Sequence, residues 1–348
     1  MAESKILLND VVIIRPLAIL LLVVWHPFII YTGGWREPIG YEYVESYWWI
    51  AKVSYAFMLE LFVFISGYVF EYSLQRKNST FKSVVISKLK RLILPSVMFS
   101  AVYYIMFYNT SEFTVGDFIY EIIDGCGHMW FLPMLFWTTI IGYLFHVSKF
   151  SRISLFLLAI IMPSLSLIPL PLRISSAFYY LLFFYFGMVV FKNRECIIDK
   201  YSKSITYSAF LGLIFIVLFI LGSLFEKVIV PQFSQSTSLL IKGGVYIVSK
   251  YVRITYALSG VVFIFLLVNY LLSRKVYELP NWIKSLNTTC FGIYLYQQFI
   301  LLILYYNTPL PSLVGPYWLP WVGLVITLIL SYLLTKLSLK TKIGRTLI

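Results

Sequence analysis

The stretch NDVVIIRPLAILLLVVWHPF, residues 9–28, decides the fold because it is an almost unbroken apolar run with the length of one membrane crossing. A helix needs about 20 apolar residues to span the roughly 30 Å hydrocarbon core of a bilayer. No small-residue cleavage site follows the run, so we expect it to remain as a signal anchor. Two ionisable residues lie inside the run after its opening Asn9 and Asp10, namely Arg15 and His26, and they are the first candidates for a functional site.

The rest of the chain repeats this apolar pattern. Of its 348 residues 60% are apolar and 12% are charged, and mean hydropathy is +0.85, whereas about a quarter of a soluble domain is charged. The composition predicts an all-α, polytopic helical bundle with about ten transmembrane helices, built as a single domain over residues 1–348. The predicted spans are 11–31, 52–74, 91–109, 129–147, 153–170, 175–191, 205–225, 251–272, 287–307 and 317–336.

The distribution of basic residues predicts the orientation. With the N-terminus in the cytoplasm, the cytoplasmic connections would hold 20 of the 28 Lys and Arg residues and the outer connections seven, with one inside the first run. This excess favours both termini in the cytoplasm. It also explains the net charge of +13 without nucleic acid, since the chain has no basic face interleaved with aromatic residues. Membrane lipid is the expected surrounding, and the oligomeric state is left open.

Arg15 and His26 lie on one face of the first predicted helix. Eleven residues correspond to three turns plus about 20°, and to about 16 Å along the axis. Arg15 would lie near the cytoplasmic surface and His26 deep in the span or toward its outer half. The alternatives are a snorkelling interfacial cation and a buried histidine that bonds a neighbouring hydroxyl or carbonyl. Ionisable residues inside a span usually face the bundle interior and mark a site.

The second predicted helix places Glu60 near mid-membrane, in FMLELFVFISGYVF. A lone carboxyl group there is either protonated or paired with Arg15 or His26 across the helices. Ser66 and Gly67 follow about two turns later. Ser66 is a candidate for substrate binding, and close helix packing is the alternative for both residues.

Two further clusters hold candidate binding residues. The fourth run opens with CGHMWFLPMLFW, where His128 and Trp130 are candidates and an interfacial aromatic belt is the alternative for the tryptophan. Lys88 and Arg91 precede the third run and would form a cytoplasmic anion site, or simply carry topological positive charge. No metal site is expected, because Cys126, Cys196 and Cys290 are far apart with no nearby histidine at ligand spacing.

Taken in this order, these residues resemble acyltransferase family 3, a bacterial family of membrane-bound O-acyltransferases. The first-helix pattern of the family is matched by Arg15, Ala18 and His26. The later matching segments are LFVFISGYVF (61–70), KLKRLILP (88–95), HMWFLPMLF (128–136) and TTCFGIYLYQQ (288–298).

Two positions depart from the family pattern. The family often has arginine where Lys88 stands, and lysine keeps the charge but loses the bidentate fork. A histidine often follows the GIYL segment by two residues, where this chain has Gln297, which cannot exchange a proton. His26 is therefore the better candidate for acid–base chemistry.

The resemblance implies transfer of an acyl group, usually acetyl, from acyl-coenzyme A to a hydroxyl of a surface polysaccharide, lipopolysaccharide or lipid-linked precursor. No bound cofactor is implied, since the coenzyme is a substrate, and the bacterial inner membrane is the expected location. His26 would act as general base and Glu60 would orient it. Arg15, Lys88 and Arg91 would bind the anionic donor. A polysaccharide exporter or other transporter is the alternative, and a non-catalytic partner of a glycan assembly complex is a third possibility.

Overall fold

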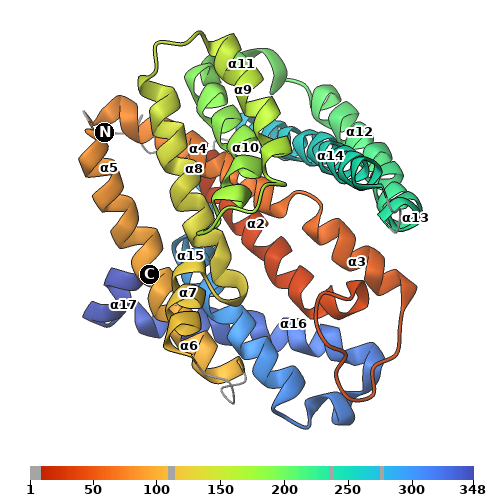
Figure 1. Ribbon diagram of the computed structural model, residues 1–348. Helices are drawn as coiled ribbons and strands as arrows, with labels where there is room; N and C mark the ends of the chain where they lie inside the picture. The colour runs from red at the N-terminus through yellow and green to blue at the C-terminus, as the bar shows by residue number, and fades with distance from the viewer. Residues whose placement is uncertain (1–8, 78, 109–113, 235–237, 275–277) are drawn as a thin grey trace.

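The computed structural model describes residues 9–77, 79–108, 114–234, 238–274 and 278–348 (Figure 1), and over these residues each of the ten predicted spans is mainly helical. All regular elements in these ranges are helical. The α-helices are α2 (Asn9–Phe28), α3 (Glu45–Tyr55), α4 (Met58–Arg76), α5 (Phe81–Lys88), α6 (Leu94–Phe107), α7 (Val115–Asp124), α8 (Phe131–Val147), α9 (Arg152–Leu165), α10 (Ile174–Lys192), α11 (Arg194–Tyr201), α12 (Ile205–Leu224), α13 (Val230–Ser234), α14 (Leu239–Arg274), α15 (Asn281–Tyr306), α16 (Leu310–Ser338) and α17 (Lys342–Leu347). Shorter 3₁₀ or π turns are η1 (Ile29–Thr32), η2 (Leu89–Ile93), η4 (Gly127–Trp130) and η5 (Phe225–Ile229).

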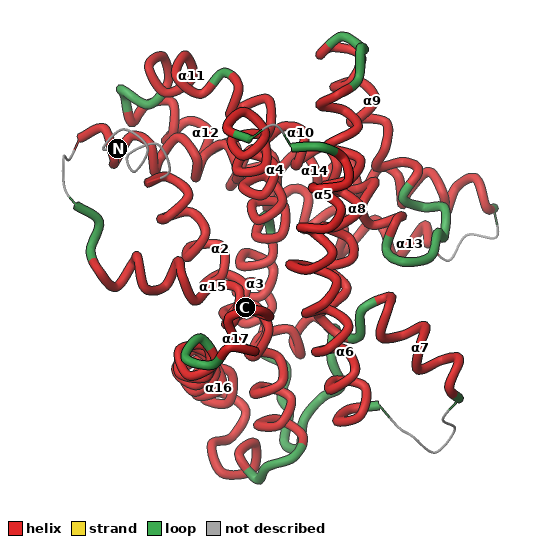
Figure 2. The backbone as a smooth tube through the Cα atoms, turned by 90° about the vertical axis from the view of Figure 1, so that its left-hand side faces the viewer, coloured by secondary structure: helices red, strands yellow, loops and turns green. Residues whose placement is uncertain are grey.

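Within the described ranges, eight helical segments are long and apolar enough to cross a membrane. The all-α membrane fold is therefore confirmed, while the count of ten spans and the cytoplasmic termini stay predictions. Of the remaining two predicted segments, α9 has only 14 residues. The other belongs to a helical run from α5 through η2 to α6, whose first half is strongly basic (Figure 2).

The eighth predicted span differs most from its helix. We expected it to begin near residue 251, but α14 begins at Leu239 and has 36 residues, equivalent to about 54 Å of helix. It lies along α12 on one side of the molecule (Figure 1). Because this helix includes Arg253, a residue assigned by sequence to an outer connection lies inside a candidate span.

Close approach of α4 and α10 forms the centre of the bundle. A Cβ atom at Gly67 would lie 2.0 Å from the carbonyl oxygen of Phe184, and one at Gly187 would lie 2.1 Å from that of Phe64. Only glycine permits these two backbones to approach so closely. Gly67 is thus a packing residue, which was the alternative to a site at this position.

Helix α2 contacts both halves of the bundle, and it carries the first candidates. It packs against α3 and α4 on one side and against α15 and α16 on the other (Figure 1). Near its outer predicted end, the Tyr305 hydroxyl of α15 donates to the Pro27 carbonyl oxygen at 3.1 Å. These contacts enclose the face of α2 that carries Arg15 and His26.

Candidate active site

A cavity of about 280 Å³ lies beside the C-terminal half of α2. Its walls are mainly aromatic, and two histidines, His26 and His128, supply imidazole rings to it. The other lining residues are Leu22, Trp25, Ile29, Trp35, Tyr55, Met58, Leu59, Tyr103, Gly127, Trp130, Phe131, Tyr294 and Gln298. The structure thus brings together three of the predicted site residues, His26, His128 and Trp130.

His26 is fixed in one tautomer by its own helix. Its Nδ1 atom lies 2.9 Å from the carbonyl oxygen of Leu22, one turn earlier. Because a carbonyl oxygen can only accept, Nδ1 carries the proton in the neutral ring and Nε2 keeps its lone pair. The ring lies edge-on to Trp25, with centroids 4.6 Å apart, and is only 3% exposed. This is the protonation form and the restraint that a general base requires.

His128 reaches the same cavity from η4. Its Nε2 atom lies 3.1 Å from the Leu295 carbonyl oxygen, to which it donates, and its own carbonyl accepts from the Tyr294 hydroxyl at 2.5 Å. Both bonds join η4 to α15. The carboxamide of Gln298 lies beside this pair and donates to the Tyr103 hydroxyl at 3.2 Å. His128 is therefore held by α15 rather than by its own segment.

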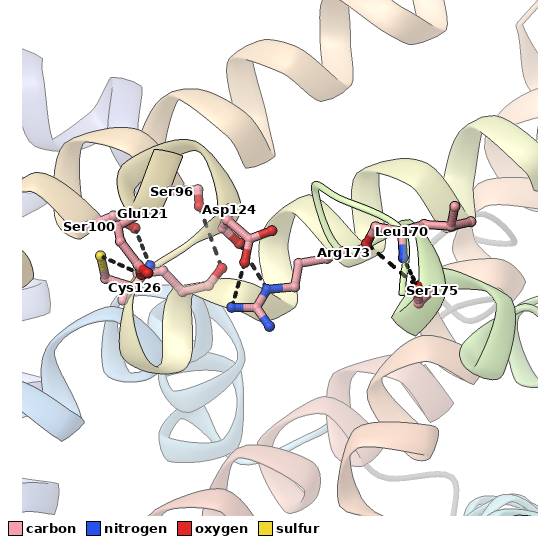
Figure 3. Close-up of polar contacts among 9 residues, drawn as sticks. Ser96, Ser100, Glu121, Asp124, Cys126, Leu170, Arg173 and Ser175 are labelled. Carbon is pink, nitrogen blue, oxygen red and sulfur yellow. Dashed lines mark hydrogen bonds and ion pairs between the residues drawn. The ribbon is translucent and has the colours of Figure 1, made fainter. Parts of the chain in front are cut away.

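A polar network holds the segment before His128 (Figure 3). Arg173 contacts the Asp124 carboxylate at 2.7 Å and donates through Nε to the Asp124 carbonyl oxygen at 3.1 Å. The Cys126 amide donates to the Ser100 hydroxyl at 3.1 Å, which ties the segment to α6. Together these bonds fix the chain where it turns from α7 into η4.

Two glycines make that turn possible. Gly125 has a φ of 92° and Gly127 a φ of 52°, both in the region that side chains disfavour. A Cβ atom at Gly127 would also lie 2.4 Å from the ring of Tyr103. The sequence CGHMW therefore places the imidazole of His128 only because residue 127 has no side chain.

Glu60 has a different partner from the one we expected. His26 bonds the Leu22 carbonyl, whereas Glu60 Oε1 lies 3.2 Å from the Nε of Arg253 and accepts from the Tyr179 hydroxyl at 3.2 Å. The expectation that Glu60 orients His26, or pairs with Arg15, does not fit these contacts. The Glu60 side chain is fully buried. Its Oε1 is bonded from α10 and α14, whereas its Oε2 has no hydrogen-bond partner among the described residues.

The Glu60–Arg253 pair nevertheless approaches the cavity through aromatic rings. The guanidinium carbon of Arg253 lies 4.4 Å from the centre of the Tyr55 ring, and Tyr55 stacks on Trp25 at 4.4 Å. Trp25 in turn contacts His26. Sequence reasoning missed Arg253 and Tyr55, although an arginine next to the apolar run ITYALSGVVFIFLLV was a signal for the first.

Arg15, Lys88 and Arg91 form a second candidate site away from this cavity. Arg15 and Lys88 each lie within electrostatic range of Arg91, and Arg15 also lies within that range of Cys290. Among the described residues, no carboxylate makes an ion pair with any of these three cations. We call this group the cation cluster. An uncompensated group of this kind is suited to bind a phosphate-bearing ligand.

Lys88 differs electrostatically from the two arginines. Burial, with the nearby charge of Arg91, lowers its pKa to about 8. Its ammonium nitrogen lies 5.5 Å from the centre of the Phe70 ring, a cation–π contact with α4. Lys88 is therefore the member of the cluster whose charge depends on pH near the physiological range.

Ser66 was a candidate for substrate binding, but its side chain is bonded within its own helix. Its hydroxyl donates to the Phe62 carbonyl oxygen at 2.8 Å within α4, and it does not line the cavity around His26. A substrate-binding role for Ser66 stays a prediction without a supporting contact. The neighbouring Gly67 packs on α10, as described above.

Comparison with known proteins identifies the family. A family model described as an acyltransferase domain matches residues 9–336, which is nearly the whole chain. No curated protein and no solved structure matches the chain in these comparisons. The match includes every helix that contributes to the cavity and to the cation cluster. The chain, with its several apolar membrane-crossing helices, therefore belongs to acyltransferase family 3 and is a membrane acyltransferase.

Proposed function

We propose that the protein transfers an acyl group, specifically acetyl, from acyl-coenzyme A to a hydroxyl of a surface polysaccharide, lipopolysaccharide or its lipid-linked precursor, in the bacterial inner membrane. The observation that supports this most directly is the Nδ1 bond of His26 to Leu22, because it leaves a basic nitrogen in a cavity of an acyltransferase. A sugar hydroxyl is a weak nucleophile near neutral pH and needs such a base.

The transfer balances with His26 alone as proton carrier. Nε2 takes the hydroxyl proton while the oxygen attacks the thioester carbonyl, so a C–O bond forms. The C–S bond then breaks, and the leaving thiolate takes the proton back from the imidazolium. The products are the ester and free coenzyme A, and the imidazole returns to its starting tautomer.

The cavity walls favour a sugar as the acceptor. Trp25, Trp35, Tyr55 and Trp130 present aromatic surface around His26. Sugar rings pack their C–H faces on aromatic rings, while a few polar groups fix the orientation of the ligand. A glycan hydroxyl would thus be held near Nε2 by packing on these rings.

The cation cluster lies where the phosphates of the donor would bind. Arg15 is eleven residues before His26 on the same face of α2, about 16 Å away along the helix axis. With the N-terminus in the cytoplasm, the cluster lies toward the cytoplasmic side and the cavity toward the outer side. In this proposal the donor enters from the cytoplasm, and the acceptor hydroxyl reaches His26 from the outer half of the membrane.

The test is the variant His26→Ala. Removal of a general base lowers turnover by about 100-fold or more, so acetyl on surface glycans, measured by mass spectrometry, should fall close to zero while the amount of glycan is normal. His146→Asn is the matched control, because His146 lies outside the cavity and its Nδ1 contacts Glu71 at 3.1 Å. The amide nitrogen of asparagine occupies the place of Nδ1 and can donate to the same carboxylate. Loss of exported glycan with unchanged acetylation would instead indicate a transporter.

A further inference from the structure

Gln297 is a fully buried carboxamide that has no hydrogen-bond partner in the described part of the chain. It is 0% exposed, and neither its Nε2 nor its Oε1 makes a hydrogen bond to any described residue. Leaving a buried donor or acceptor unpaired costs about 1–3 kcal/mol, and such groups are rare in folded proteins. The proposed proton transfer does not use this residue. A bound ligand that forms hydrogen bonds with the carboxamide would explain why a glutamine is kept at this buried position.

The position of Gln297 follows from the packing of α15 against α2. Cys290, seven residues earlier and thus on nearly the same face, lies close to Arg15 of α2. Tyr305, eight residues later, bonds the Pro27 carbonyl next to His26. Helices α2 and α15 therefore run side by side in the same direction, and Gln297 lies at a level between the cation cluster and His26.

The proposed donor places amides at this level. Between its phosphates and its thioester sulfur, coenzyme A carries the pantetheine arm, a chain of 12 bonds with two secondary amides. Extended, 12 bonds equal four residues of polypeptide, or about 14 Å. The separation of Arg15 and His26 along α2 is about 16 Å. With the phosphates at the cation cluster and the thioester at His26, the arm must pass the level of Gln297.

We propose that Gln297 binds a secondary amide of the pantetheine arm and so positions the thioester at His26; this rests on the function proposed above. A carboxamide offers one donor group and one acceptor, the complement of the N–H and C=O of an amide. Because Gln297 is enclosed, binding must separate α2 from α15 locally. The hydrogen bonds gained by its unpaired atoms offset part of the cost of that separation.

The experiment compares three donors in membranes of the native cells: acetyl-coenzyme A, acetyl-pantetheine, which has the amides but no phosphates, and ethyl thioacetate, which has neither. Transfer of labelled acetyl into glycan gives kcat/KM for each. In Gln297→Leu we expect the preference for acetyl-pantetheine over ethyl thioacetate to fall about tenfold, with ethyl thioacetate used as well as by wild type. Lys88→Ala with Arg91→Ala should affect only acetyl-coenzyme A.

The ratio of two donors does not depend on how much variant folds, and Gln297→Met provides a second variant of similar length. Gln232→Leu, the same substitution at an exposed glutamine of α13, is the control. If the ratio of kcat/KM between acetyl-pantetheine and ethyl thioacetate is unchanged in Gln297→Leu, the inference is overturned. An equal loss with all donors gives that result, and it is expected if Gln297 holds only a water molecule or supports packing. If wild type moves no acetyl from acetyl-coenzyme A to glycan, the proposed function fails, and the inference fails with it.

Discussion

At the scale of single residues, local geometry prepares His26 for its proposed role. The acceptor for Nδ1 is the Leu22 carbonyl, four residues earlier in the same helix. Pro27 follows directly, and its carbonyl is bonded from α15. The imidazole is thus oriented by backbone groups, without a carboxylate. Lys88 is the contrasting residue, because its charge is set by its surroundings.

The pKa of Lys88 gives a prediction about donor binding. Since burial lowers this pKa to about 8, the ammonium is charged at pH 7 and mostly neutral at pH 9.5. We expect KM for acetyl-coenzyme A to rise about tenfold across that interval as one charged hydrogen bond to phosphate is lost. In Lys88→Arg the charge persists, so KM should stay flat. The same pH dependence in both proteins would argue against a contact between Lys88 and the donor.

At the scale of elements, the short segment between α7 and α8 does more than connect them. The bonds from Arg173 and Ser100 fix its start, and α15 holds His128 at its end. The segment therefore couples three parts of the bundle to one wall of the cavity. Its glycines are required by backbone angle at Gly125 and by lack of space at Gly127.

Gly127→Ala tests this element. The added methyl group would meet the ring of Tyr103, which also lines the cavity. Overpacking of this kind costs about 1–3 kcal/mol, so the melting temperature should fall and acetyl transfer should drop more than tenfold as the cavity wall shifts. Gly116→Ala in α7, where a Cβ atom meets nothing within 4 Å, is the control. Full activity of Gly127→Ala would mean that the wall is not tightly constrained.

At the scale of the whole molecule, the two candidate sites lie at different levels of one helix, α2. The distribution of positive charge predicts that the cation cluster lies toward the cytoplasm. In the function proposed above, this arrangement would separate the donor from the acceptor by membrane face, so the proposed mechanism depends on the orientation of the protein. Chemical labelling of a natural cysteine can report the orientation of the protein in the membrane. Cys196 in α11 is exposed, whereas Cys126 and Cys290 are buried.

We expect a membrane-impermeant maleimide to label Cys196 from the cytoplasmic side only. Intact cells should give no label, and inverted vesicles should give labelling that Cys196→Ser abolishes. Gel-shift or mass spectrometry of the purified protein provides the measurement. Labelling in intact cells would reverse the predicted orientation and place the cation cluster outside.

The sequence by itself determined the features that depend on neighbours along the chain. Apolar runs of spanning length predicted the ten segments of the chain that are mainly helical and apolar, although not the shorter helices between them. A spacing of eleven residues placed Arg15 and His26 on one face, because helical periodicity is local. The grouping of Lys88 and Arg91 followed from their proximity in the sequence. The family could likewise be recognised from short motifs within single helices.

Only the tertiary structure decided which helices meet. Glu60 pairs with Arg253, 193 residues away, and His128 lies beside His26 because η4 is bonded to α15. Periodicity gives the face that a residue occupies but not the helix that packs on it. For a buried carboxylate the partner is therefore set by packing, since the pair forms only where two faces come within hydrogen-bond distance. The same packing leaves Gln297 without a hydrogen-bond partner among the residues that the structure describes, and no sequence pattern could reveal this.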